Sequence, residues 1–131
     1  DEMTLYCAHS AALRIVDAGT RHEEITRVTG LVPSRVHLRG EAVDEKPGAV
    51  WPADYWAIKS PLPKVASMTA HLVWLWVQVE PHADYFRRLL REGVHMHVYC
   101  KHTSNSSQLR FSVEPEGFRI VHELGVPLEV S

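Results

Sequence analysis

The sequence predicts one α+β domain over residues 1–131, a two-layer sandwich in which helices pack on one face of a mostly antiparallel sheet. Segments that alternate apolar and polar residues, as strands do, are interleaved with segments of helical periodicity. Hydrophobic residues make up 45% of the 131 residues, which is enough for one core. The end of the chain repeats the strand–helix–glycine–strand order of its beginning, which favours a pseudo-duplicated, ferredoxin-like plan.

Residues 4–16 predict one long strand. Alternate positions share one parity and are expected to face the core, whereas Ser10 and Arg14 fall on the other face. The side chains expected in the core are Leu5, Cys7, His9, Ala11, Leu13 and Ile15.

A helix and a second strand are predicted between Thr20 and Glu41. Thr20 and Glu23 have the capping-box spacing at the start of the helix. Ile25 and Val28 form its apolar face, and Gly30 supplies the left-handed residue that commonly ends a helix. The residues after it alternate, with Val36 and Leu38 on one face, and predict a half-buried strand closed by Gly40.

The middle of the chain predicts a loop, a short strand and an apolar helix. Residues 41–53 are charged and contain Pro and Gly, which suits a surface loop. Residues 54–59 predict a strand with Trp56 and Ile58 on one face. Residues 68–79 are ambiguous, because VWLWVQV also suits a strand; their length and the following Glu80-Pro81 favour a helix. Its buried stripe is expected to be Met68, Leu72, Leu75, Trp76 and Val79.

Two helices, three strands and one loop are predicted after Pro81. They are a helix ending at Gly93, a strand over residues 94–101, a polar hairpin loop over 103–108, a strand over 109–113, and a helix from Pro115 to Gly125 followed by a strand over 126–130. The last helix is expected to bury Phe118, Val121 and Leu124. In the pseudo-duplication, Leu109-Arg110-Phe111 corresponds to Leu13-Arg14-Ile15.

Composition excludes several classes of function. The net charge of -2 gives no global excess of basic residues for nucleic acid. No apolar run is long enough to span a bilayer. Cys7 and Cys100 do not make a disulfide scaffold. We therefore expect a cytoplasmic protein with reduced thiols, no membrane or nucleic-acid partner, and no cofactor.

Several short motifs resemble an uncharacterised bacterial family of unknown function, DUF4279. They are the Gly30-Leu31-x-Pro33-Ser34 run, Arg39-Gly40-Glu41, Trp56 after a loop, Ser60-Pro61-Leu62, a helix like His71-Leu72 through Leu75, and Glu123-Leu124-Gly125-Val126. The resemblance implies this family's fold and, through some members, a bacterial immunity-type role. It implies no catalytic residue. The chain departs from the pattern in its many histidines and in the doubled Trp74 and Trp76.

Nine histidines raise a metal hypothesis, with Cys7-x-His9, His95-x-His97 and Cys100-x-His102 as candidate pairs. Strand parity argues against one site that uses all of them. Cys7 and His9 fall on the core face, whereas His95 and His97 point opposite to Cys100. We therefore favour solvated or hydrogen-bonded histidines, and keep a metal-dependent enzyme using His95 and His97 as the alternative.

The leading functional hypothesis is a non-enzymatic domain that binds another protein or a second copy of itself. No catalytic residue is expected, because the sequence has no nucleophile elbow, Walker or dinucleotide glycine pattern. Trp51 lies in a loop and Trp74 lies off the buried helical stripe, which favours partner contact. His71, one helical turn before Trp74, is expected to share its surface. Arg87 and Arg91 lie on a basic helix face, which is expected to meet an acidic partner if it is a contact surface. A small-ligand pocket beside Trp56 remains a further alternative.

Overall fold

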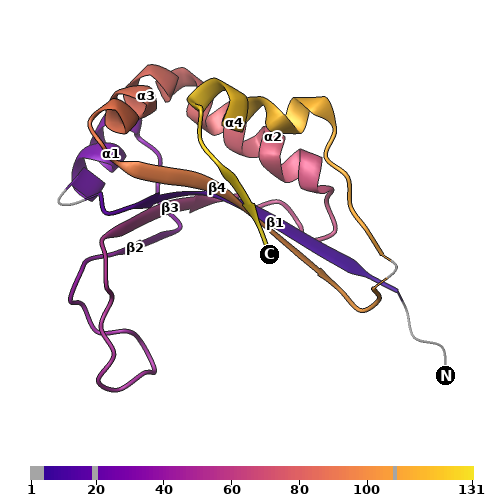
Figure 1. Ribbon diagram of the computed structural model, residues 1–131, viewed down its shortest axis with the longest axis horizontal. Helices are drawn as coiled ribbons and strands as arrows, with labels where there is room; N and C mark the ends of the chain where they lie inside the picture. The colour runs from indigo at the N-terminus through magenta and orange to yellow at the C-terminus, as the bar shows by residue number, and fades with distance from the viewer. Residues whose placement is uncertain (1–4, 19–20, 108) are drawn as a thin grey trace.

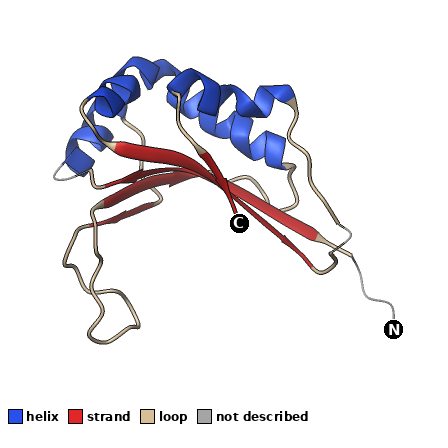
Figure 2. Cartoon of the chain, viewed as in Figure 1, coloured by secondary structure: helices blue, strands red, loops and turns tan. Residues whose placement is uncertain are grey.

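The computed structural model describes residues 5–18, 21–107 and 109–131 as one α+β domain. Five strands form an open sheet, and the helices lie across one face of it (Figures 1 and 2), so the predicted fold class is confirmed. In chain order the elements are β1 (Cys7–Val16), α1 (His22–Thr29), β2 (Arg35–His37), β3 (Tyr55–Lys59), α2 (Met68–Val79), the 3₁₀ segment η2 (Glu80–His82), α3 (Ala83–Arg91), β4 (His95–Ser104), the 3₁₀ segment η3 (Pro115–Phe118), α4 (Arg119–Leu124) and β5 (Leu128–Val130).

The strands follow the order β2-β3-β1-β4-β5, with β1 at the centre. β1 pairs antiparallel with both β3 and β4, β3 pairs antiparallel with β2, and β4 pairs parallel with β5. β1 and β2 therefore run parallel with β3 between them, which is the split β–α–β unit of ferredoxin-like folds. β4, α4 and β5 form a second β–α–β unit whose strands are adjacent.

The predicted strand over residues 109–113 is wrong, because these residues have no strand structure. β4 instead supplies the first strand of the second unit, since its pairing with β1 continues from Val16↔His95 to Cys7↔Ser104. Residues 109–114 lead to the helical layer, where the Glu114 amide donates to Thr69 Oγ1 at 2.9 Å. Phe111 and Val113 are apolar because they pack against the edge of the core.

The core lies between the helices and the sheet, and β1 contributes Leu13 and Ile15 with no exposed surface. α2 contributes every residue of its predicted stripe, and both of its predicted ends are confirmed. The predicted stripe of the last helix is partly wrong: Phe118 is 43% exposed, whereas Ile120 is fully buried. Phe118 belongs to η3, and the tighter 3₁₀ turn shifts the phase of the buried face before α4 begins.

Three other predictions near the first strand and helix are corrected. Leu5 is 61% exposed because β1 begins only at Cys7. Val28 is 44% exposed, since α1 buries Ile25 and Thr29, and the Thr29 hydroxyl donates to the Ile25 carbonyl at 2.7 Å. Val36 is 38% exposed because β2 is a three-residue strand at the edge of the sheet.

The ends of α1 illustrate one confirmed cap and one that lies outside the described residues. Gly30 ends the helix at φ 70°, and its amide donates to the Thr26 carbonyl, as the sequence predicts. The capping role of Thr20 falls outside the described residues. In the described part of the chain, no helix has the length and apolar character needed to cross a membrane.

Candidate functional site

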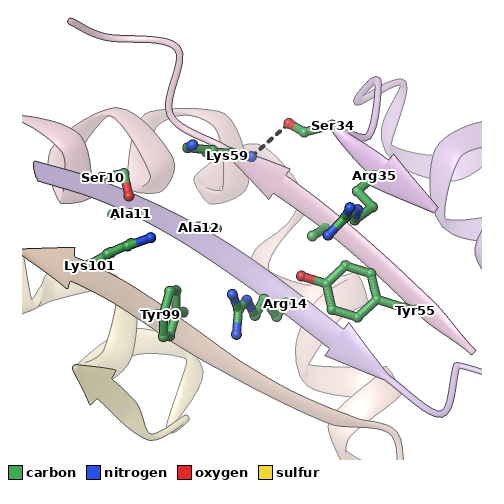
Figure 3. Close-up of a pocket in the computed structure, with 11 residues that line it drawn as sticks. Ser10, Ala11, Ala12, Arg14, Ser34, Arg35, Tyr55, Lys59, Tyr99 and Lys101 are labelled. Atoms are coloured by element: carbon green, nitrogen blue, oxygen red, sulfur yellow. Dashed lines mark hydrogen bonds between the residues drawn. The ribbon is translucent and has the colours of Figure 1, made fainter. Parts of the chain in front are cut away.

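The face of the sheet opposite the helices carries a hollow of about 370 Å³ (Figure 3). β1, β3 and β4 provide most of its walls, and the start of β2 closes one side. The hollow is lined by Ser10, Ala11, Ala12, Arg14, Ser34, Arg35, Tyr55, Ala57, Lys59, Tyr99 and Lys101.

Two alanines explain why this part of the sheet is hollow. Ala12 lies at the centre of the sheet, opposite Lys59 on one side and Tyr99 on the other. Ala57 is the partner of Arg14 in the next pair along. Because side chains on one face of a sheet stand side by side, short ones at these positions leave space between long neighbours.

The lining is cationic. It contains Arg14, Arg35, Lys59 and Lys101, and none of its eleven residues is acidic. Within the described residues, none of these four cations forms an ion pair, whereas Arg87 and Arg88 in the helical layer each pair with carboxylates. The chain as a whole has a net charge of -2, so the positive charge of this face is a local feature.

Arg14 is positioned at the centre of this surface. Its guanidinium carbon lies 3.6 Å from the centre of the Tyr99 ring, a cation–π contact that holds the side chain across the sheet. The Tyr99 hydroxyl is hydrogen bonded to Ser131 Oγ. Arg14 Nε is buried without a hydrogen-bond partner in the described residues. An arginine held in this way can present its planar N–H groups to a carboxylate.

An aromatic stack lies beside the hollow, where β2, β3 and the loop between them meet. His37 lies between Trp51 and Tyr55, with ring centres 3.7 Å and 4.7 Å away and nearly parallel planes. Burial lowers the pKa of His37, which favours the neutral ring. Arg35 lies over Trp51, 5.7 Å from the ring centre. The stack therefore connects Trp51 to the cationic lining through Arg35 and Tyr55.

Trp51 differs from the sequence expectation of a loop residue with little to bury it. It is half-buried, its amide donates to the Glu41 carbonyl at 2.9 Å, and its carbonyl accepts from the Gly40 amide at 2.8 Å. These bonds and the His37 contact hold the ring beside the sheet. Its role in partner contact stays a prediction. The structure adds that the ring packs against His37 and lies near Arg35.

His71 is buried, so its predicted place on an exposed surface with Trp74 is wrong. Its side chain is 1% exposed, and Nδ1 lies 2.8 Å from the Ser60 hydroxyl. α2 turns this residue toward the sheet, where it joins the buried side of the helix.

We expect the free energy of unfolding to fall on acidification because of His71. Burial lowers the pKa of His71, and the nearby charges of His9 and Lys59 act in the same direction, against one backbone hydrogen bond. Below the ordinary pKa of 6.5 the unfolded chain therefore takes up a proton that the folded chain refuses, so stability decreases as the pH falls through this window. Urea unfolding at pH 7.5 and 5.5 measures the effect, and His71→Asn should reduce the difference. An equal pH dependence in this variant would contradict the assignment to His71.

The other predicted contact residues are divided between two parts of the helical layer. Trp74 is half-buried and lines a second hollow of about 590 Å³ with Val73 and Val77. Arg87 is engaged within the chain, since its Nη1 and Nη2 lie 2.9 Å and 3.2 Å from Asp84 and Glu123 carboxylate oxygens. Arg91 is exposed and has no ion-pair partner in the described residues. These residues do not form one continuous surface with Trp51.

The predicted pair of metal ligands, His95 and His97, lies on the open face near the start of β4. His97 Nδ1 is 3.7 Å from a Glu129 carboxylate oxygen, and burial lowers the pKa of His97. No third ligand joins this pair within the described residues. Cys100 packs in the core, where burial raises the pKa of its thiol to about 11. The structure instead brings Cys7 and His9 together with His102.

The cationic face was not predicted from the sequence, although strand parity contained one signal of it. Parity placed Ser10 and Arg14 on the face opposite the core, and the same rule applied to β3 and β4 puts Lys59 and Lys101 on that face. The register that makes them neighbours, with Ser10 opposite Lys101 and Ala12 opposite Lys59, comes only from the structure.

Comparison with known proteins gives a family and no activity. No curated protein and no solved structure showed significant similarity to the chain. A family model described as a domain of unknown function matches residues 6–131, nearly the whole chain and every strand and helix of the structure. The chain belongs to the DUF4279 family.

Proposed function

We propose that the chain is a protein-binding domain that takes an acidic segment of its partner on the cationic face of the sheet. The observation that carries the proposal is the concentration of Arg14, Arg35, Lys59 and Lys101 around one hollow, without a carboxylate partner in the described residues. Cations left unpaired on a surface attract carboxylates, and complementary charge steers association and selects the partner.

The size of the cationic region favours a protein over a nucleic acid. Nucleic-acid binding draws most of its affinity from many phosphate contacts along a broad basic surface. Here the cations surround a hollow of about 370 Å³ in a chain of net charge -2. Tyr55 and Tyr99 supply ring surface between the charges, which suits a peptide that carries both carboxylates and apolar side chains.

The family resemblance implies a biological role for this binding. An immunity-type role would use the same face, by covering an acidic surface of the target protein. Two free cysteines fit a reducing compartment such as the bacterial cytoplasm. A homodimer through the hollow beside Trp74 is the alternative way for this chain to bind a protein.

The experiment compares three anionic probes by calorimetry with the full chain. The probes are an oligoglutamate peptide, a single-stranded oligonucleotide of similar charge, and inorganic phosphate. We expect the peptide to bind most tightly, with an affinity that decreases as salt is raised from about 0.05 to 0.5 M, because exposed charges are screened. Tighter binding of the oligonucleotide, or no binding of the peptide at low salt, would overturn the proposal.

A further inference from the structure

The helix-covered face of the sheet carries a cluster of metal-binding residues at the end remote from His95. Cys7 and His9 lie two residues apart on β1, and His102 lies directly opposite His9 on β4. One potential ligand atom from each of the three lies within 4.8 Å of the other two. A zinc ion at ordinary bond lengths would hold these atoms about 3.3 to 3.7 Å apart, so small side-chain rotations suffice.

A hydrogen bond from one ring nitrogen of His9 leaves the other ring nitrogen free to bind a metal. His9 Nδ1 lies 3.1 Å from the Ala66 carbonyl oxygen. A carbonyl only accepts, so Nδ1 carries the proton and the lone pair of the neutral ring is on Nε2. Metal-bound histidines commonly donate their second nitrogen to a carbonyl or carboxylate in this way. The His9 amide also donates to the Lys64 carbonyl at 2.8 Å, which fixes the strand at this position.

Two ring nitrogens in this cluster have no other role in the described structure. His9 Nε2 and His102 Nδ1 are both buried and have no hydrogen-bond partner among the described residues. Leaving such atoms buried and unpaired costs stability, and a bound cation would remove the cost.

Aromatic rings pack together around the cluster. The His9 and His102 rings stack with centres 5.1 Å apart. Phe111 packs against both rings, at 5.8 Å and 4.9 Å. Phe111, in the segment that follows β4, thus provides an apolar wall of the kind that surrounds many metal sites.

We propose that Cys7, His9 and His102 bind one Zn²⁺ ion. Thiolate and imidazole are the ligands that zinc prefers, and two histidines with one cysteine supply three of its four positions. The fourth position is open to a water molecule. The site lies on the opposite face of the sheet from the cationic hollow, so the proposal is independent of the proposed protein-binding function.

The test uses the full chain without an affinity tag, freed of metal by a chelator and kept reduced. We expect one equivalent of Zn²⁺ to bind in calorimetry, and Co²⁺ used as a probe to give the absorption bands of a tetrahedral site with thiolate coordination. Cys7→Ser should remove the thiolate band, and His102→Gln should weaken Zn²⁺ binding by more than about 100-fold, which exceeds the usual effect of losing an outer-shell partner.

His95→Gln is the matched control, because it removes a histidine from the same strand without touching the cluster. It should bind Zn²⁺ as the wild type does. Circular dichroism of each metal-free variant checks that the fold is retained, and Cys7→Ser provides a conservative second variant if His102→Gln unfolds. The proposal is overturned if the wild type binds no stoichiometric Zn²⁺, or if His95→Gln loses as much affinity as Cys7→Ser.

Discussion

Trp56→Ala is expected to lower the free energy of unfolding by about 3 to 5 kcal/mol, the usual range for removing a buried aromatic side chain. Trp56 has no exposed surface and lies in β3, one strand from the centre of the sheet. Its indole Nε1 donates to Thr26 Oγ1 on α1 at 3.1 Å. The substitution therefore leaves a cavity and also breaks the side-chain link between the sheet and α1. Urea unfolding monitored by circular dichroism measures the loss.

Trp51→Ala is the control for this measurement. Trp51 is half-buried and contributes one face of the stack with His37, so its loss should cost about 1 kcal/mol, the size of an aromatic pair contribution. In a chain of this length such a loss lowers the melting temperature by about 4 °C. A loss below about 1 kcal/mol for Trp56→Ala would show that Trp56 is not a packing residue, and would favour the alternative of an aromatic ligand pocket.

Local patterns were sufficient to predict most of the helices and strands. α2 is confirmed at both ends, although its VWLWVQV segment also suits a strand, because the tertiary structure covers it on the side of the predicted stripe. Gly30 and Gly125 both end helices in the left-handed conformation, at φ 70°. These features depend on residues a few positions apart, which sequence periodicity reports directly.

The errors arose where long-range pairing decides the structure. Residues 109–113 have the composition of a strand, but β4 continues to Ser104 and occupies the place beside β1. Phe118 has helical spacing with Val121, but a 3₁₀ turn rotates it away from the core. Composition alone contains neither the length of a strand pairing nor the pitch of a short helix.

For the metal hypothesis too, the local pattern was predictable and the long-range pairing was not. Strand parity gave the face on which a side chain lies, but the register between strands was needed to show which side chains meet. Parity correctly separated Cys7 and His9 from His95 and His97. The predicted strand ended at residue 101; β4 continues to Ser104, and the same rule extended along it puts His102 on the core face with Cys100. Only the pairing of His9 with His102 shows which of these residues meet, because a shift of one residue would place them on opposite faces.

The partner-binding residues were the least predictable from the sequence. Exposure of an aromatic or basic side chain depends on what the rest of the chain places next to it. His71 is buried on the core-facing side of α2, and Arg87 is held by Asp84 and Glu123, so neither side chain is free on the surface. The four cations of the open face come from four different strands or strand ends, and no local pattern joins them.

Reversing two charges on the open face should weaken binding of the oligoglutamate probe by at least about tenfold, or about 1.4 kcal/mol. Lys59→Glu with Lys101→Glu replaces attraction by repulsion on the two strands that flank β1. Both lysines are exposed and unpaired in the described residues, so the free energy of unfolding should change by no more than about 0.5 kcal/mol. Calorimetry at low salt measures the affinity.

Two comparisons separate a local site from the overall charge of the chain. Arg27→Glu with Arg91→Glu makes the same change in net charge on the helical layer, at two exposed arginines without ion pairs in the described structure, and should leave the affinity nearly unchanged. Ala12→Leu alters no charge but fills the centre of the hollow, and should also weaken binding. Binding at a defined site depends on where the charges lie. If the helical-layer variant loses as much affinity as the variant of Lys59 and Lys101, the probe responds only to the net charge of the chain, and the proposed site is wrong.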